Sequence, residues 1–129
     1  MRPALVADEQ VADALVAAFR RDGYAGASIR DLAHATGLKS ASLYHRFPRG
    51  KADMALAALA RAGEGFEALV VAPLETAGEP AERLNASAEG LARFYDGGEL
   101  ACLLAVLAAS DAPQPVRAAV AAAFARWRR

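Results

Sequence analysis

The chain has 129 residues, 55% of them hydrophobic, and its 15 Lys and Arg balance its 15 Asp and Glu. That length suffices for one compact domain, or for a small domain with a helical extension. The zero net charge excludes binding to nucleic acid through global charge alone, so any such binding must come from a local patch. The balance hides an uneven split, because residues 1–54 hold 8 basic and 6 acidic side chains, whereas residues 55–129 hold 7 and 9.

Compartment and membrane signals indicate a cytoplasmic protein. The single cysteine, Cys102, argues against a disulfide framework and fits a reducing compartment. Asp8 and Glu9 interrupt any apolar stretch of a signal peptide. The longest apolar run, residues 100–109, falls far short of the ~20 residues that a membrane-spanning helix needs. Ala, Leu, Glu and Arg favour helix and no strand-like alternation is visible, so we predict an all-α fold.

The first predicted helix covers about residues 8–21. Val11, Leu15 and Phe19 recur at helical spacing and form its buried stripe. Gly23 should end this helix, and Tyr24 should lie in the core beneath the helices that follow.

Residues 28–51 predict two short helices joined by a tight turn. Ser28 followed by Asp31 is typical of a capped helix start. Gly37 suits the left-handed conformation after a helix end, and Ser40 is a plausible N-cap for the second helix. Pro48 ends that helix. A helix, a glycine-containing turn and a second short helix make a helix-turn-helix pattern.

The second helix of this motif has a surface suited to the major groove. Leu43 and Phe47 share its buried face, while every charged residue between Lys39 and Lys51 is basic. Hydroxyl and imidazole groups add hydrogen-bond donors, and a small alanine allows close approach of the backbone to DNA. Lys51 opens the next helix, where a bound phosphate would offset its unfavourable place at the positive helix end. The candidate DNA-binding residues are therefore Arg30, Lys39, Ser40, Ala41, Ser42, Tyr44, His45 and Lys51.

This region resembles the DNA-binding domain of the TetR family of bacterial repressors. The resemblance rests on Tyr24, on residues 28–33 and 36–38, and above all on residues 42–48, Ser-Leu-Tyr-His-Arg-Phe-Pro, ending at Lys51. The Pro-Arg-Gly-Lys connection is similar to that of a branch with Pro-Gly-Gly-Lys. The resemblance implies a DNA-binding domain over residues 1–50 and a helical regulatory domain over residues 51–129. It also implies that Ser28, besides capping its helix, contacts phosphate.

The remaining helices follow from periodicity and from Gly and Pro breaks. A long helix runs from Lys51 to about Val71, and residues 73–80 form a loop. A helix to about Tyr95 has five inward residues, a buried helix spans residues 99–109, and a last helix starts near Pro115. The inward residues of the helix that ends at Tyr95 are Leu84, Ala88, Leu91, Phe94 and Tyr95.

The sequence stops at Arg129 in the middle of the last helical pattern. Proteins of the resembled type usually continue for several tens of residues, which supply the dimer interface. We therefore expect a regulatory domain that is incomplete at its C-terminus. A homodimer is what the family implies, and for this chain dimerisation stays open.

The function that the resemblance implies is a ligand-responsive repressor, released from double-stranded operator DNA by a small apolar effector. It needs no cofactor and no metal. The helices beyond Pro73 would enclose the effector pocket, although core packing alone also explains every candidate residue. The candidate ligand-binding residues are Phe66, Leu91, Phe94, Tyr95, Cys102, Val106 and Phe124.

Two other classes of protein are alternatives to a repressor. A helical protein-interaction module that does not bind DNA would fit the Ala-rich, apolar C-terminal half. An enzyme is disfavoured, because the sequence contains no Ser-His-Asp, Cys-His or His-Glu-x-x-His arrangement, no glycine-rich phosphate loop and no cluster of metal ligands.

Overall fold

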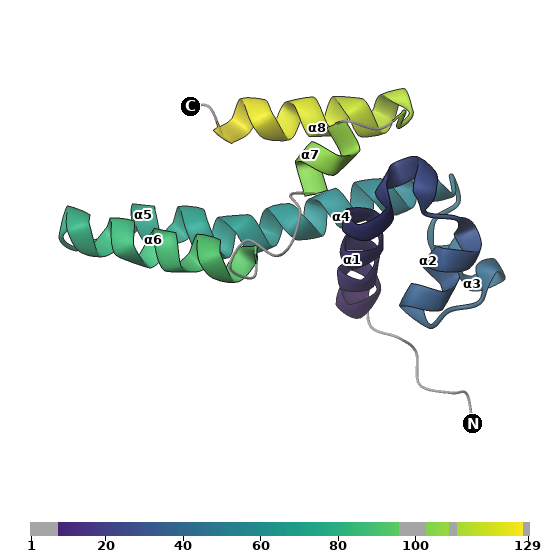
Figure 1. The fold of residues 1–129 in the computed structure, drawn as a ribbon, viewed down its shortest axis with the longest axis horizontal. Helices are drawn as coiled ribbons and strands as arrows, with labels where there is room; N and C mark the ends of the chain where they lie inside the picture. Colours follow the sequence, from purple (N-terminus) through teal and green to yellow (C-terminus); the bar gives the residue numbers. More distant parts are fainter. Residues whose placement is uncertain (1–7, 96–102, 109–110, 128–129) are drawn as a thin grey trace.

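The computed structural model describes residues 8–95, 103–108 and 111–127, and every element in these ranges is helical (Figure 1). This confirms the predicted all-α class. In chain order the elements are α1 (Asp8–Gly26), α2 (Ile29–Thr36), α3 (Ser40–Arg46), α4 (Lys51–Phe66), the π-helical segment η1 (Glu67–Val71), α5 (Ala72–Glu75), α6 (Pro80–Phe94), α7 (Leu103–Ala108) and α8 (Gln114–Trp127).

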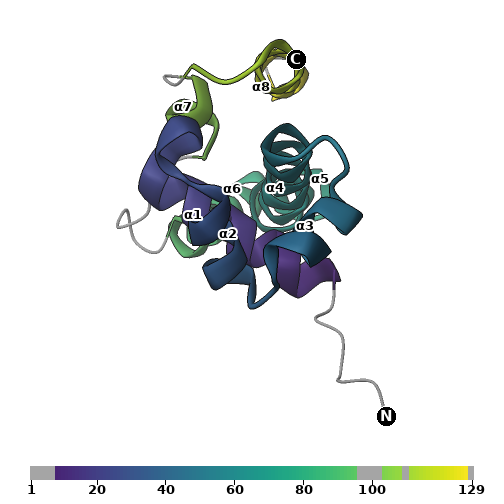
Figure 2. The ribbon, with the colours of Figure 1, turned by 90° about the vertical axis from the view of Figure 1, so that its right-hand side faces the viewer.

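A single rod made of α4, η1 and α5 organises the molecule. Figure 1 shows α1, α2 and α3 gathered around the N-terminal end of this rod, while α6 runs back along its other end. Figure 2 views the rod end-on, with α8 beside α4 and pointing the same way. No helix among the described residues is long and apolar enough to cross a bilayer.

The core lies where α1 crosses α4. The predicted stripe of α1 is confirmed, because Val11, Leu15 and Phe19 are all buried. They pack in one cluster with side chains from α2, α3, α4, α7 and α8, so the helix-turn-helix shares its core with the helices beyond it. The other large side chains that are fully buried are Leu32, Leu43, Met54, Leu107 and Val116.

The helix that starts at Lys51 continues past the predicted end at Val71 and through Pro73, which corrects the predicted loop over residues 73–80. Proline has no N–H to donate to the carbonyl four residues earlier, which is that of Leu69. The backbone widens to a π-helical turn just before the proline, where the Ala72 N–H donates to the carbonyl of Glu67. The proline is therefore accommodated by a local widening of the helix.

The carbonyls of this widened turn face α6. Ser87 Oγ donates to the Val70 carbonyl at 2.8 Å. Gly90 lies so close that a Cβ at this position would overlap the Leu69 carbonyl. Only a glycine allows this close approach at position 90. The hydrogen bond of Ser87 and the close approach of Gly90 make these two the buried residues of α6.

This packing corrects the predicted inward face of α6. Leu84 is 63% exposed, Leu91 is 41% exposed and Ala88 is also exposed. The hydrophobic pattern had suggested that the larger apolar residues face inward, but close contact with the η1 backbone turns the small residues inward instead. Of the predicted set, Phe94 and Tyr95 are half-buried.

The two glycines of α4 have different environments. A Cβ at Gly65 would lie 3.2 Å from Cε1 of Phe94, so this glycine permits close packing of α6. A Cβ at Gly63 would meet nothing within 4 Å.

Candidate functional site

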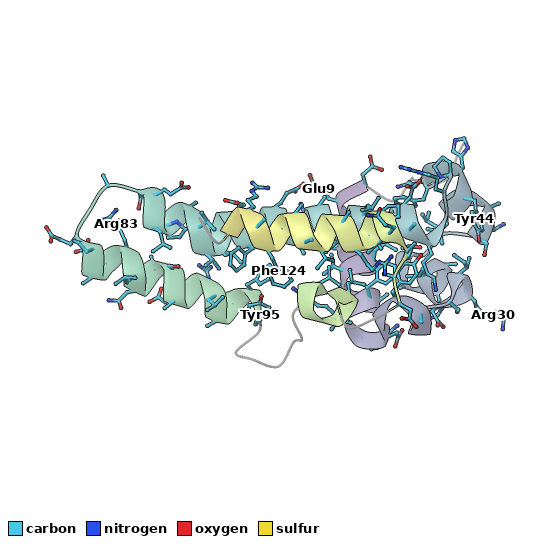
Figure 3. All side chains as sticks on the ribbon, turned by 90° about the horizontal axis from the view of Figure 1, so that it is seen from above. Glu9, Arg30, Tyr44, Arg83, Tyr95 and Phe124 are labelled. Carbon is cyan, nitrogen blue, oxygen red and sulfur yellow. The ribbon has the colours of Figure 1, made fainter. Side chains whose placement is uncertain are left out.

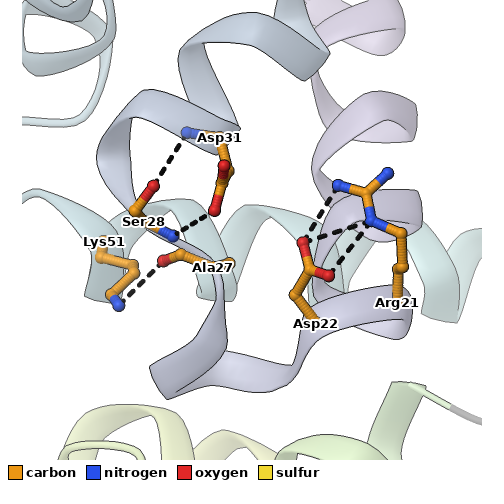
Figure 4. A network of polar contacts seen from close by, with 6 residues as sticks. All are labelled: Arg21, Asp22, Ala27, Ser28, Asp31 and Lys51. Carbon is orange, nitrogen blue, oxygen red and sulfur yellow. Dashed lines mark hydrogen bonds and ion pairs between the residues drawn. The ribbon is translucent and has the colours of Figure 1, made fainter.

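The junction between α1 and α2 is the anchor of the candidate DNA-binding surface. The predicted break at Gly23 is present, because its φ of 75° and ψ of 178° are not helical. One further turn, which ends at Gly26, follows this break. Lys51, at the start of α4, reaches this junction. Its ammonium donates to the carbonyl of Tyr24 at 2.9 Å. It also donates to the carbonyl of Ala27 at 3.0 Å, the bond drawn in Figure 4.

The same ammonium lies 4.8 Å from the centroid of the Tyr24 ring, an arrangement that favours a cation–π interaction. The Tyr24 ring stacks on buried Phe19 with ring centroids 6.1 Å apart, so Tyr24 is half-buried and packs against the edge of the core, where the sequence predicted a core position. Burial raises the pKa of the Tyr24 phenol. Lys51 thus ties the first turn of α4 to the loop from which α2 starts.

The start of α2 is a reciprocal capping box, as predicted. Asp31 N–H donates to Ser28 Oγ at 3.0 Å, and Ser28 N–H donates to the Asp31 carboxylate at 3.1 Å (Figure 4). The hydrogen bond that the Ser28 backbone N–H donates to the Asp31 carboxylate, with a smaller contribution from the Ser28 side chain, lowers the pKa of this carboxyl because it stabilises the charged form. The cap fixes the direction of α2 relative to α1.

The turn between α2 and α3 is closed by backbone geometry. Gly37 takes the predicted left-handed conformation with φ 74°. The N–H of Leu38 donates to the Ala33 carbonyl at 3.2 Å and that of Gly37 to the His34 carbonyl at 3.3 Å, the pattern of a Schellman motif. Buried Thr36 adds a hydrogen bond from Oγ1 to the Leu32 carbonyl at 2.8 Å. The turn is therefore rigid on both sides of the glycine.

Helix α3 buries one residue and exposes most of the others. Leu43 is fully buried in the common core, whereas Tyr44 is 48% exposed. The prediction that Ser40 is the N-cap of α3 is wrong. Lys39 is the N-cap, and no side chain donates or accepts a capping hydrogen bond at this end. Ser40 is the first helical residue, so its hydroxyl is left exposed on the surface.

Ion pairs divide the basic residues of the motif into two groups. Arg46 pairs with Asp8 at 2.9 Å and Arg49 pairs with Asp53 at 3.0 Å. Arg30 and Lys39 are exposed and have no carboxylate partner within the ranges that the structure covers. These two cations are thus available to an anionic partner such as a phosphate backbone.

The structure brings the predicted DNA-binding residues to one end of the molecule. Figure 3 shows Arg30 and Tyr44 at the end opposite Arg83, both directed outward. Lys51 differs from the rest, because it is half-buried and two of the three N–H groups of its ammonium already have acceptors. Its predicted phosphate contact stays a prediction. The exposed members of the set are Ser28, Arg30, Lys39, Ser40, Ala41, Ser42, Tyr44 and His45.

A cavity of about 870 Å³ lies between α4 and α8, with walls from α1, the end of α6 and α7. Three of the predicted ligand-binding residues line it: Phe66, Phe94 and Tyr95. The Phe94 ring packs edge-on against those of Phe66, at 5.7 Å, and Tyr95, at 4.8 Å. The cavity therefore has an aromatic end.

The other predicted ligand-binding residues lie elsewhere. Leu91 and Phe124 are 41% and 44% exposed and do not line the cavity. Val106 lies near the break at Gly23, with its Cγ1 3.8 Å from where a Cβ of that glycine would stand. Cys102 falls outside the described residues.

Sequence reasoning missed several of the cavity walls. Leu56 and Leu59 have the helical spacing of ordinary core residues, and the alanines of α8 give no pattern that would distinguish a cavity wall from a core. Arg20 was not singled out because a charged residue near the end of an amphipathic helix ordinarily faces water. The lining residues that were not predicted include Arg20, Leu56, Leu59, Glu67, Leu103, Ala119, Ala123 and Arg126.

Comparisons with known proteins agree with this geometry. Residues 11–58 match the family described as bacterial regulatory proteins, tetR family. The chain is 27% identical over 81 residues to a protein of Bacillus subtilis (strain 168) named "Uncharacterized HTH-type transcriptional regulator YxaF". That alignment covers 63% of this chain and 42% of the relative. Both matches are regulators, which supports the prediction that the chain is not an enzyme.

Proposed function

We propose that this chain, whose residues 11–58 form a helix-turn-helix domain of the tetR family, is a transcriptional repressor that binds operator DNA until an effector occupies its cavity. The observation that carries the DNA-binding part is the surface of α2 and α3. It presents exposed Arg30 and Lys39, which have no carboxylate partner in the part of the chain that the structure describes, together with exposed hydroxyl groups.

In this proposal α3 enters the major groove. Exposed Lys39, Ser40, Ala41 and Ser42 stand at its N-terminal end, the part of a recognition helix that reads base edges. Ser28, Arg30, Tyr44 and His45 stand around it and contact phosphates, which sets position and affinity but not sequence. Lys51 acts from behind this surface by holding the α1–α2 junction against α4.

Release by an effector follows from the two roles of α4. Its residues Leu56, Leu59 and Phe66 line the cavity, and its first residue, Lys51, holds the junction from which α2 begins. A ligand that alters the spacing between α4 and α8 would displace Lys51 relative to α1. If the ligand binds the displaced state more tightly, it lowers the population that can bind DNA.

Binding to two half-sites needs a second copy of the chain. Leu84 and Leu91 form an exposed apolar stripe on α6, and Leu74 is exposed as well. Such a stripe favours association between proteins, and we propose that it contributes to a homodimer. Two copies of α3 about 34–36 Å apart would then read consecutive major grooves. The same stripe supports the alternative, a protein-interaction module that does not bind DNA.

Selection from a random pool of duplex DNA tests the proposal. We expect the native chain to enrich a defined sequence, and a palindrome if it binds as a dimer. A Ser42→Ala variant should shift the enriched sequence, because it changes an exposed side chain on α3. Tyr44→Phe should instead weaken binding to all sequences alike.

If folded protein at low salt enriches no sequence and retains no DNA from the pool, DNA binding is contradicted and the interaction module is favoured. Enrichment that is identical for native protein and for the Ser42→Ala variant would contradict the assignment of Ser42 to base reading.

A further inference from the structure

We infer that the cavity takes a small organic anion, a carboxylate carried on an apolar body, and that Arg20 binds the carboxylate. The inference rests on the proposed function, since it specifies the effector of that cavity. It changes the expectation from the sequence, which was an effector that is simply apolar.

Arg20 places a positive charge at a wall that is otherwise largely apolar. It comes from α1 and lines the cavity, with its guanidinium carbon 5.1 Å from the centroid of the Phe94 ring. Its Nε is buried and has no hydrogen-bond acceptor among the described residues. The ring face stabilises the cation in part, but a buried N–H without an acceptor is costly. An anion in the cavity would supply that acceptor.

The two carboxylates that line the cavity do not serve this purpose. Glu67 of η1 pairs with Arg126 of α8 at 3.2 Å, and Glu64 pairs with Arg61 at 3.2 Å. Their charges are thus matched by other arginines, and the charge of Arg20 is left without a carboxylate within the described ranges. A guanidinium binds a carboxylate with two parallel hydrogen bonds, which makes this anion a good match.

The rest of the cavity suits an apolar body. Leu56, Leu59 and Phe66 form the α4 wall, and Ala119 and Ala123 form the facing wall of α8. The small alanines leave space between the two helices, and the volume of about 870 Å³ falls within the range of small-molecule sites. A ligand with its carboxylate at Arg20 would lay its apolar part between α4 and α8.

Arg20 also links this site to the DNA-binding surface. It lies one helical turn before Tyr24, whose carbonyl accepts a hydrogen bond from Lys51. An anion that draws Arg20 toward the cavity therefore acts on the helix that leads into α2. An uncharged apolar ligand lacks this contact and acts only through α4 and α8.

Calorimetric titration of the native 129-residue chain tests the inference. The probes are straight-chain carboxylates from hexanoate to dodecanoate, each compared with the alcohol of the same length. At the best length we expect the carboxylate to bind about tenfold more tightly than its alcohol, the effect of one charge-assisted hydrogen bond. Arg20→Gln should abolish this preference while leaving the alcohol affinity nearly unchanged.

Arg117→Gln is the matched control, because it removes an exposed arginine of α8 that does not line the cavity. It should keep the tenfold preference, and Arg20→Lys should keep part of it. The inference is overturned if the native protein binds carboxylates and alcohols with equal affinity, or binds neither. This outcome needs only the native protein, so it decides the question even if the Arg20 variants do not fold. A preference that survives Arg20→Gln overturns it as well.

DNA binding is measured on the same preparation, which separates the two proposals. A chain that binds DNA but shows no carboxylate preference retains the proposed DNA-binding function and loses this effector class. A chain that prefers carboxylates but does not bind DNA contradicts the proposed function alone.

Discussion

Replacing Lys51 with methionine should destabilise the protein, because the ammonium of Lys51 holds the α1–α2 junction. The variant keeps most of the aliphatic stem but loses the hydrogen bonds to the carbonyls of Tyr24, at 2.9 Å, and Ala27, at 3.0 Å. Hydrogen bonds from a charged donor contribute about 1.5–3 kcal/mol each, and the half-exposed position lowers this to about 1 kcal/mol each. The contact with the Tyr24 ring adds about 0.5 kcal/mol. We therefore expect a loss of about 2–3 kcal/mol in the free energy of unfolding.

Urea unfolding followed by circular dichroism measures this loss, and Lys39→Met is the matched control. Lys39 is exposed and makes no side-chain cap, so its replacement should change the free energy of unfolding by less than about 0.5 kcal/mol. DNA binding should distinguish Lys51 from a cation that contacts phosphate. Loss of a phosphate contact lowers the slope of log affinity against log salt by about 0.9, and we expect this change for Arg30→Met and not for Lys51→Met.

A Lys51→Met protein as stable as the native chain would refute the junction role. A salt slope that falls for Lys51→Met would show instead that the third N–H of its ammonium contacts phosphate, as the sequence alone suggested.

Three further predictions concern packing, capping and phosphate contact. Gly90→Ala should destabilise the protein by at least about 2 kcal/mol, because the methyl group would overlap a backbone carbonyl. Gly63→Ala, where the methyl group meets nothing within 4 Å, should be neutral or stabilising by up to ~1 kcal/mol. Urea unfolding of both variants checks this contrast. Ser28→Ala should cost about 1 kcal/mol of stability, because the Asp31 N–H loses its acceptor. The pKa of Asp31 should rise only part of the way to its ordinary value, because the backbone N–H of residue 28, the larger cause of the lowered pKa, still donates to the carboxylate. Since that pKa is lowered in the native fold, this contribution to stability is present above the ordinary carboxyl range and is lost as the pH falls through the lowered value, which NMR titration of the carboxyl can follow. Tyr44→Phe should weaken binding to all duplexes by up to about tenfold with no change in stability, and an altered sequence preference at unchanged non-specific affinity would contradict its phosphate role.

The features that the sequence predicted well depend on nearby residues. The capping box at Ser28 and the left-handed turn at Gly37 involve partners within a few positions, so spacing alone defines them. The buried stripe of α1 is equally local, because one helical period determines which side chains share a face. The N-cap of α3 was missed by one residue, where no side-chain hydrogen bond marks the boundary.

The features that were missed depend on contacts between distant segments. The inward face of α6 is set by the approach of Gly90 to the widened turn before Pro73, and hydrophobic periodicity does not record such an approach. The hydrogen bonds of Lys51 reach Tyr24, which is 27 positions earlier in the chain, and Ala27, which is 24 positions earlier. Arg20 is found at the cavity only once α1, α4 and α8 are placed together. The predicted boundary at residue 50 stays a prediction, and α4 packs in one core with α1 and α8.

The most direct test of DNA binding by the α2–α3 surface is a titration of a fluorescently labelled random-sequence duplex with the native chain, followed by anisotropy at about 50 mM and 200 mM salt. We predict saturable binding at the lower salt and an affinity at least about tenfold weaker at the higher salt, because exposed cations such as Arg30 and Lys39 displace counterions from the DNA. Folded protein that shows no change in anisotropy at the lower salt would contradict DNA binding by the α2–α3 surface.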